Sequence, residues 1–131
     1  MWNKAPAMMR EMKARTISVP RLQAREMSDL VAYLYSVRYF ADPADPRKGR
    51  ELATAKGCLG CHSIAGTGGK VGPDLAQVKG LDSAVAVIAA LWNHGFIMAE
   101  RAERRQVAWP RLRPEEMAHL VAFLQVLGQT R

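Results

Sequence analysis

The clearest pattern of apolar positions lies near the end of the chain. Between residues 114 and 128, apolar side chains recur at helical spacing and form one stripe of Met117, Leu120, Val121, Leu124 and Leu127. The segment 25–38 has a matching stripe of Met27, Leu30, Val31 and Leu34. Such stripes predict amphipathic helices, and the apolar face of each helix must be buried against another element.

Two further segments are predicted as helices from the signals at their ends. The segment 46–57 has a proline in its first turn and a glycine at its end. The segment 83–94 is almost wholly apolar, with Asp82 or Ser83 as its N-cap and Gly95 as its stop. The predicted fold class is therefore all-α.

Composition narrows the class of protein. The chain has 131 residues, 49% of them hydrophobic and 24% charged, which argues against disorder. Its longest apolar run, 83–92, is half of the roughly 20 residues that a membrane span needs. The first residues lack the charged start and apolar core of a secretory signal.

The two cysteines form one motif, Cys58-Leu59-Gly60-Cys61-His62. Cys-x-x-Cys-His is the signature of c-type haem attachment. Two thiols at this spacing reach the two vinyl groups of one porphyrin and form thioethers, and the adjacent histidine binds the iron. The motif predicts one haem c per chain, held by Cys58 and Cys61, with His62 as the proximal ligand.

Three other interpretations of the cysteines are weaker. A thioredoxin-like redox pair lacks the surrounding βαβ pattern. A zinc site lacks a second cysteine pair and would need His94 and His119 as distant ligands. An ordinary disulfide is the third interpretation.

With its flanks, the motif resembles a class I c-type cytochrome domain over residues 41–131. The resemblance rests on the helix before the motif, on Gly72-Pro73-Asp74-Leu75 within a glycine-rich loop, on a downstream methionine and on a C-terminal helix with an aromatic residue. It implies that the Pro73 carbonyl accepts a hydrogen bond from the outer nitrogen of His62 and orients the imidazole. It also implies that the first helix crosses the last, through Leu52 and the group Leu120, Phe123 and Leu124.

The resemblance places the sixth iron ligand in a loop after the helix 83–94, where Met98 lies. The family's Met-Pro pair is absent, since Ala99 follows Met98. Bis-histidine ligation through His94, or an open sixth position, are the alternatives. Buried tryptophans near a haem edge donate to a propionate or fill the core, and Trp92 and Trp109 are candidates for either role.

The chain contains an internal repeat. Shifted by 90 positions, residues 1–37 match residues 91–127 at 13 of 37 ungapped positions, including Trp2-Asn3 with Trp92-Asn93 and Met8 with Met98. Residues 1–40 are therefore predicted to be the distal half of an incomplete second module, a ligand loop followed by a C-terminal helix. A linker over 42–46 leads into the complete module at 41–131.

Three explanations of the half-module stay open. It continues an upstream haem half of a tandem protein, it completes a haem on another polypeptide with Met8 as ligand, or it is a relic without haem. In each case its apolar stripe must be covered by a missing half-module, by the complete module or by a partner subunit.

The predicted function is one-electron transfer by a carrier, not catalysis by an enzyme. A fixed subunit of an oxidoreductase complex is one alternative, and an open-site haem protein for sensing or peroxidase-like chemistry is another. The net charge of +7 favours redox partners with acidic docking surfaces, and no nucleic-acid reader motif is present. The resemblance to c-type cytochromes, whose haem is attached outside the cytoplasm, implies an exported, periplasmic protein.

Overall fold

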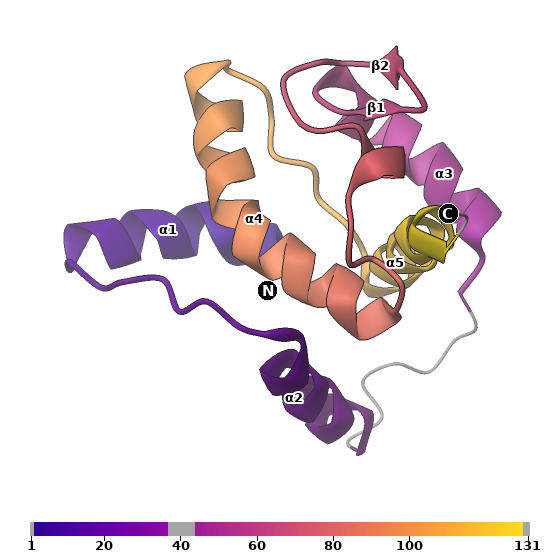
Figure 1. Cartoon of the computed structure of the whole chain (residues 1–131). Helices are drawn as coiled ribbons and strands as arrows, with labels where there is room; N and C mark the ends of the chain where they lie inside the picture. Colours follow the sequence, from indigo (N-terminus) through magenta and orange to yellow (C-terminus); the bar gives the residue numbers. More distant parts are fainter. Residues whose placement is uncertain (1, 37–43, 130–131) are drawn as a thin grey trace.

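The computed structural model describes residues 2–36 and 44–129 of the chain. Five α-helices dominate this part and confirm the all-α class: α1 Ala5–Ala14, α2 Ala24–Ser36, α3 Pro46–Ala55, α4 Ala84–Arg104 and α5 Pro114–Gln129. Between α3 and α4 lies a short antiparallel hairpin of β1 Ser63–Ile64 and β2 Thr67–Gly68. Figure 1 shows α1 and α2 on one side of α4, with α3 and α5 on the other.

The main core forms where α3 crosses α5. Gly49 allows the close approach, since a Cβ there would overlap the His119 carbonyl oxygen and lie 2.6 Å from the Phe123 Cβ. Ala53, one turn along α3, is fully buried. The predicted crossing of the first and last helices of the module at 41–131, which are α3 and α5, is confirmed. Leu52, which was expected in this contact, is only partly buried. The buried core consists of Ala53, Leu81, Val87, Leu112, Leu120, Val121, Phe123 and Leu124.

The predicted end of the long helix is wrong. Ser83 is the N-cap, as one prediction had it, and its hydroxyl accepts the Ala86 N–H at 3.2 Å. The helix α4 then runs through Gly95 to Arg104 instead of stopping. Gly95 is buried and lies against the indole of Trp2, which would be in ordinary contact with a Cβ at this position. The predicted ligand loops are therefore helical, both around Met98 and in α1.

Side chains of each repeated segment form hydrogen bonds with the backbone of the other. The Trp2 indole donates to the Pro110 carbonyl at 3.1 Å, and the Trp92 indole donates to the Pro20 carbonyl at 3.1 Å. Asn3 bonds both backbone groups of Leu112, at 2.7 and 2.8 Å. At the equivalent positions, the Asn93 side chain bonds the carbonyl of residue 22 at 2.8 Å and its N–H at 3.0 Å. Each segment thus anchors the loop of the other.

Local geometry also matches between the segments. Thr16 and Gln106, which are 90 positions apart, both adopt a left-handed backbone with φ of 55° and 56°. The assignment of residues 1–40 to a haem half-module stays a prediction, and the proposed boundary at 40/41 lies outside the described residues.

Glu116 caps α5, and its carboxylate gives a pH-dependent contribution to stability. It accepts the Arg113 backbone N–H at 2.8 Å and the Lys56 ammonium at 3.0 Å, and these two contacts lower its pKa. A carboxylate whose pKa is lower in the folded protein than in the unfolded chain stabilises the fold at any pH above its unfolded-state pKa. This stabilisation is lost as the pH falls through the folded-state pKa.

We therefore expect Glu116→Gln to lower the melting temperature at pH 7 and to have a much smaller effect near pH 3. Glu26→Gln is the matched control, because Glu26 accepts the Gln23 N–H at 2.8 Å in the same cap geometry on the exposed helix α2. Thermal unfolding between these pH values measures both. An E116Q effect that does not change with pH would contradict this account.

Candidate haem site

Helix α3 delivers the chain directly to the cysteine motif. The Asp45 carboxylate caps its start by accepting the Arg47 N–H at 2.8 Å. The helix ends before Gly57, whose φ of 78° favours glycine. A 3₁₀ turn, Cys58–Gly60, follows, and the His62 N–H donates to the Cys58 carbonyl at 3.0 Å. This single tight turn fixes both thiols and the imidazole relative to one another.

The side chains of Cys58 and Cys61 are half-buried and not joined to each other. Burial raises the pKa of the Cys58 thiol, because an apolar environment disfavours the thiolate. Within residues 2–36 and 44–129, no three His, Cys, Asp or Glu side chains are grouped to hold a metal ion. The His119 Nδ1 accepts the Asp45 N–H at 2.9 Å, so this histidine holds the residue that precedes α3. These observations do not favour the zinc or disulfide interpretations.

The imidazole of His62 is held on two sides. Its Nδ1 lies 2.9 Å from the Pro73 carbonyl oxygen, which is the predicted hydrogen bond. Since a carbonyl only accepts, Nδ1 carries the proton and Nε2 keeps its lone pair for a metal. Gly72 packs against the ring, and a Cβ there would lie 2.6 Å from Nδ1. The residues present therefore fit an axial haem ligand whose orientation is fixed from behind.

Asp74 holds the loop that carries Pro73. Its carboxylate accepts backbone N–H groups of Ala65 at 3.1 Å, Gly66 at 2.6 Å and Ala76 at 2.9 Å. Several hydrogen bonds to the carboxylate lower the pKa of Asp74, and the bond from the Gly66 N–H has the largest effect. The turn between β1 and β2 and the segment after Pro73 are thus joined at one side chain.

His94 and Met98 lie one turn apart on one face of α4. Burial lowers the pKa of His94, and the charges of His62 and Arg101 lower it further, so these side chains lie within electrostatic range. Met98 is half-buried and one helical turn further on, hence on the same face of α4. Arg101 donates to the Val71 carbonyl at 3.0 Å and ties α4 to the loop before Pro73.

The indole N–H groups of Trp92 and Trp109, for which a propionate role or core filling was predicted, donate to backbone carbonyls in this structure. The Trp92 indole has one N–H, and Pro20 accepts it. Its ring meets Phe96 edge-on, with centroids 5.5 Å apart. The Trp109 N–H donates to the Trp2 carbonyl at 3.1 Å. Both indole N–H groups therefore form hydrogen bonds between the two repeated segments.

Met8, the predicted ligand of a second haem, is half-buried on α1. It occupies the position equivalent to Met98 in the repeat, and the only cysteines of the chain belong to the motif at 58–62.

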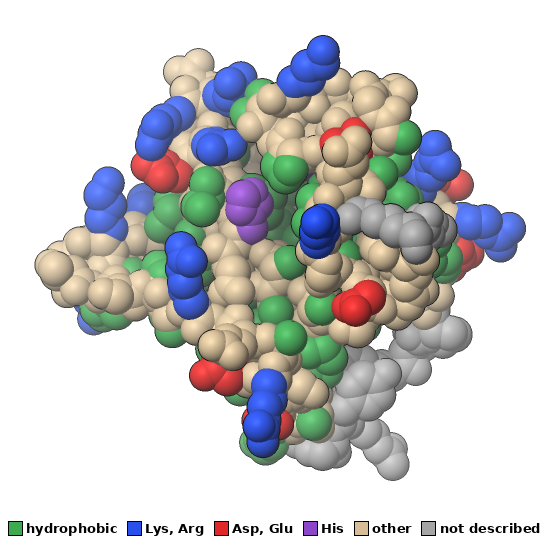
Figure 2. All heavy atoms as spheres, in the orientation of Figure 1, with side chains coloured by type: hydrophobic (Ala, Val, Ile, Leu, Met, Phe, Trp, Pro, Cys, Tyr) green, Lys and Arg blue, Asp and Glu red, His purple; other side chains and the backbone are tan. Residues whose placement is uncertain are grey.

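Basic side chains surround this region. An open cleft of about 580 Å³ is lined by Lys70, Val71, Arg101, Arg104 and Arg105, next to the loop that holds Pro73. Figure 2 shows histidine surface between α4 and the β1–β2 segment, with Lys and Arg side chains around it.

Sequence reasoning missed three residues of this site. Gly72 and Asp74 flank Pro73 in the motif that carried the resemblance, so their roles were signalled there. Arg101 is the third, and no local pattern in the sequence indicates its bond to Val71.

Comparison with protein families identifies the chain. The cytochrome c family model matches residues 46–128, which begin at the first residue of α3 and end one residue before the end of α5. Comparisons with curated proteins and with solved structures gave no match. The matched range contains the cysteine motif, Pro73 and Met98, and covalent haem c is the group that the family carries. The chain therefore belongs to the cytochrome c family.

Proposed function

We propose that this cytochrome c domain relays single electrons between redox proteins, with His62 and Met98 as the axial ligands of its haem iron. The haem supplies the redox chemistry, because its iron cycles between two oxidation states. The hydrogen bond from His62 Nδ1 to Pro73 carries the proposal, since it leaves Nε2 available and raises the basicity of the ring. A buried, fixed ligand keeps its position in both oxidation states.

Met98 is proposed as the second ligand because it lies on the same face of α4 as His94, which is within electrostatic range of His62. A thioether favours reduced iron and gives a higher potential than a second histidine would. His94 lies one turn away on the same face and is the alternative residue for the same ligand position.

Replacing Met98 by alanine is expected to abolish the thioether-to-iron charge-transfer absorption of the oxidised protein. His94→Ala should leave that absorption in place. Absorption spectra of both variants, with carbon monoxide binding to the reduced forms, test the assignment. Loss of the native spectrum only in H94A would show bis-histidine ligation. Stoichiometric carbon monoxide binding by the unmodified protein would show an open site.

We further propose that the basic cleft beside the haem loop steers acidic partners. Lys70, Arg104 and Arg105 are exposed there, and positive potential around a redox site raises the rate of encounter with anions. The covalent cofactor supports an exported, periplasmic location for the protein. None of the described helices is long and apolar enough for a bilayer span.

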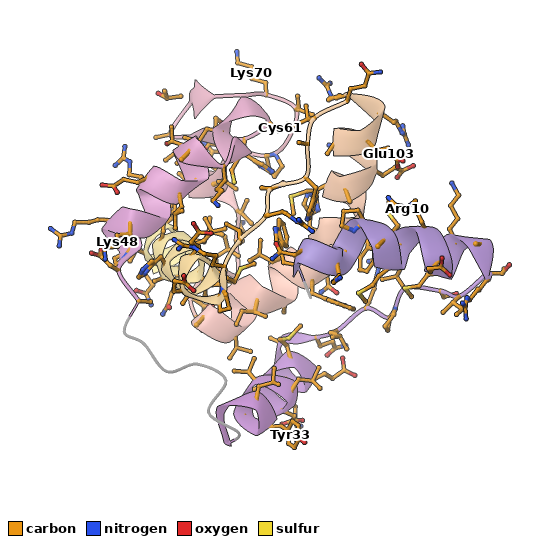
Figure 3. All side chains as sticks on the ribbon, turned by 180° about the vertical axis from the view of Figure 1, so that it is seen from behind. Arg10, Tyr33, Lys48, Cys61, Lys70 and Glu103 are labelled. Atoms are coloured by element: carbon orange, nitrogen blue, oxygen red, sulfur yellow. The ribbon has the colours of Figure 1, made fainter. Side chains whose placement is uncertain are left out.

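The double variant Lys70→Glu with Arg105→Glu should slow oxidation by the anionic complex ferricyanide by about tenfold at low salt. It should accelerate oxidation by a cationic cobalt complex, and salt should diminish both effects. A double reversal of Lys48 and Arg50 on α3 is the control, since Lys48 lies far from Lys70 in Figure 3. Stopped-flow rates at several ionic strengths measure this, and equal slowing in both double variants would contradict a local effect.

A further inference from the structure

The repeated helices α2 and α5 differ in how much of the same face is covered. Leu120 on α5 is 5% exposed, whereas Leu30, its equivalent on α2, is 45% exposed. Phe123 is 5% exposed, and its equivalent Tyr33 is 67% exposed. Figure 3 shows Tyr33 at the outer edge of α2. The same sequence pattern is therefore buried on α5, whereas on α2 Met27 is buried but Leu30 and Tyr33 are exposed.

The helix α3 packs on α5 where Gly49 meets His119 and Phe123, and it leads directly into the haem-attachment motif. The sequence around this contact is repeated in kind and order: Leu30, Val31, Ala32, Tyr33 and Leu34 on α2 correspond to Leu120, Val121, Ala122, Phe123 and Leu124 on α5.

A polar side chain capable of the same contact stands at the equivalent position of α2. On α5, the His119 side chain accepts the backbone N–H of Asp45 at the start of α3. The equivalent residue on α2 is Asp29, which is exposed and has carboxylate oxygens that accept the same kind of bond. A carboxylate is in addition favoured beside the N-terminus of an arriving helix.

We infer that the exposed face of α2 docks a haem-bearing proximal half-module: a helix with small residues at the positions of Gly49 and Ala53, followed by Cys-x-x-Cys-His. The docked half-module completes a second haem site, in which Met8 on α1 takes the place of Met98. The ligand role of Met8 rests on the proposed function of Met98, but the docking surface does not.

The proposal can be tested with a proximal half-module taken from the chain itself. Because Met1 corresponds to residue 91, a fusion with residues 41–90 placed before Met1 offers α2 the half-module that already covers α5. The fusion is exported with haem attachment and analysed by intact mass, by absorption and by carbon monoxide binding. We expect twice the haem per chain of the original protein and twice its thioether-to-iron absorption. Met8→Ala should return that absorption to the original level.

The docking surface is tested by Leu30→Glu in the fusion, which should expose the added haem to carbon monoxide. Val107→Glu is the control, since Val107 is 50% exposed and lies outside both helix faces. Equal spectra of the L30E and V107E fusions would overturn the proposal. So would a dimer of the original chain in ultracentrifugation that L30E breaks, because a second copy would then be the occupant. If Met98→Ala leaves the original spectrum unchanged while L30E still exposes the added haem, docking stands and the methionine assignment fails.

Discussion

Replacing Gly49 by alanine is expected to destabilise the protein by about 3 kcal/mol, at the upper end of the cost of overpacking a core. The added methyl group would overlap the His119 carbonyl oxygen, which belongs to the backbone of α5 and has no rotamer to change. The two helices must therefore separate, and the contacts of Ala53 and Phe123 weaken with them. Thermal unfolding should show a melting temperature lower by roughly 10 °C.

Gly95→Ala is the matched control for this change. Gly95 also lies inside a helix, but a Cβ there would sit 3.7 Å from the Trp2 ring, an ordinary contact. Alanine at such a position stabilises a helix by up to about 1 kcal/mol. If both variants gain stability, the close crossing of α3 and α5 does not hold.

Replacing Gly72 by alanine is expected to displace the imidazole of His62. The new Cβ would overlap the ring and lie 2.6 Å from Nδ1, so the hydrogen bond to Pro73 cannot keep its geometry. Loss of such a supporting contact typically weakens a metal site by about 10- to 100-fold. We expect high-spin haem absorption and carbon monoxide binding to appear in the reduced variant.

Gly60→Ala tests whether this effect is specific to the imidazole. Gly60 lies within the cysteine motif itself, yet a Cβ there meets no atom within 4 Å. The G60A protein should keep the spectrum and the ligand-binding behaviour of the original protein. A G72A spectrum identical to that of G60A would mean that the His62 ring is not confined as described.

The haem-attachment unit was predictable because its chemistry is local. The Cys-x-x-Cys-His motif fixes three functional groups within five residues, and Pro73 lies only eleven residues beyond His62. Helix α3 was predictable from its proline and glycine ends for the same reason. The buried stripe of α5 followed from periodicity, since one helix face must be covered whatever covers it.

The course of α4 was not predictable from its own residues. A glycine after an apolar helix favours a stop, whereas Gly95 lies inside α4, against the Trp2 indole that arrives from the other end of the chain. The hydrogen bond of Trp92 was not predictable for the same reason, because its acceptor is the distant Pro20. Local patterns state what a residue prefers, but not which distant segment it meets.

The exchange of Trp and Asn side chains between the repeated segments has a consequence for cooperativity. Each loop is held in part by the other segment, because Asn3 bonds Leu112 while Asn93 bonds Leu22. Opening either segment therefore breaks hydrogen bonds of both. We expect residues 2–36 and the repeated segment at 92–126 to open together and not one before the other.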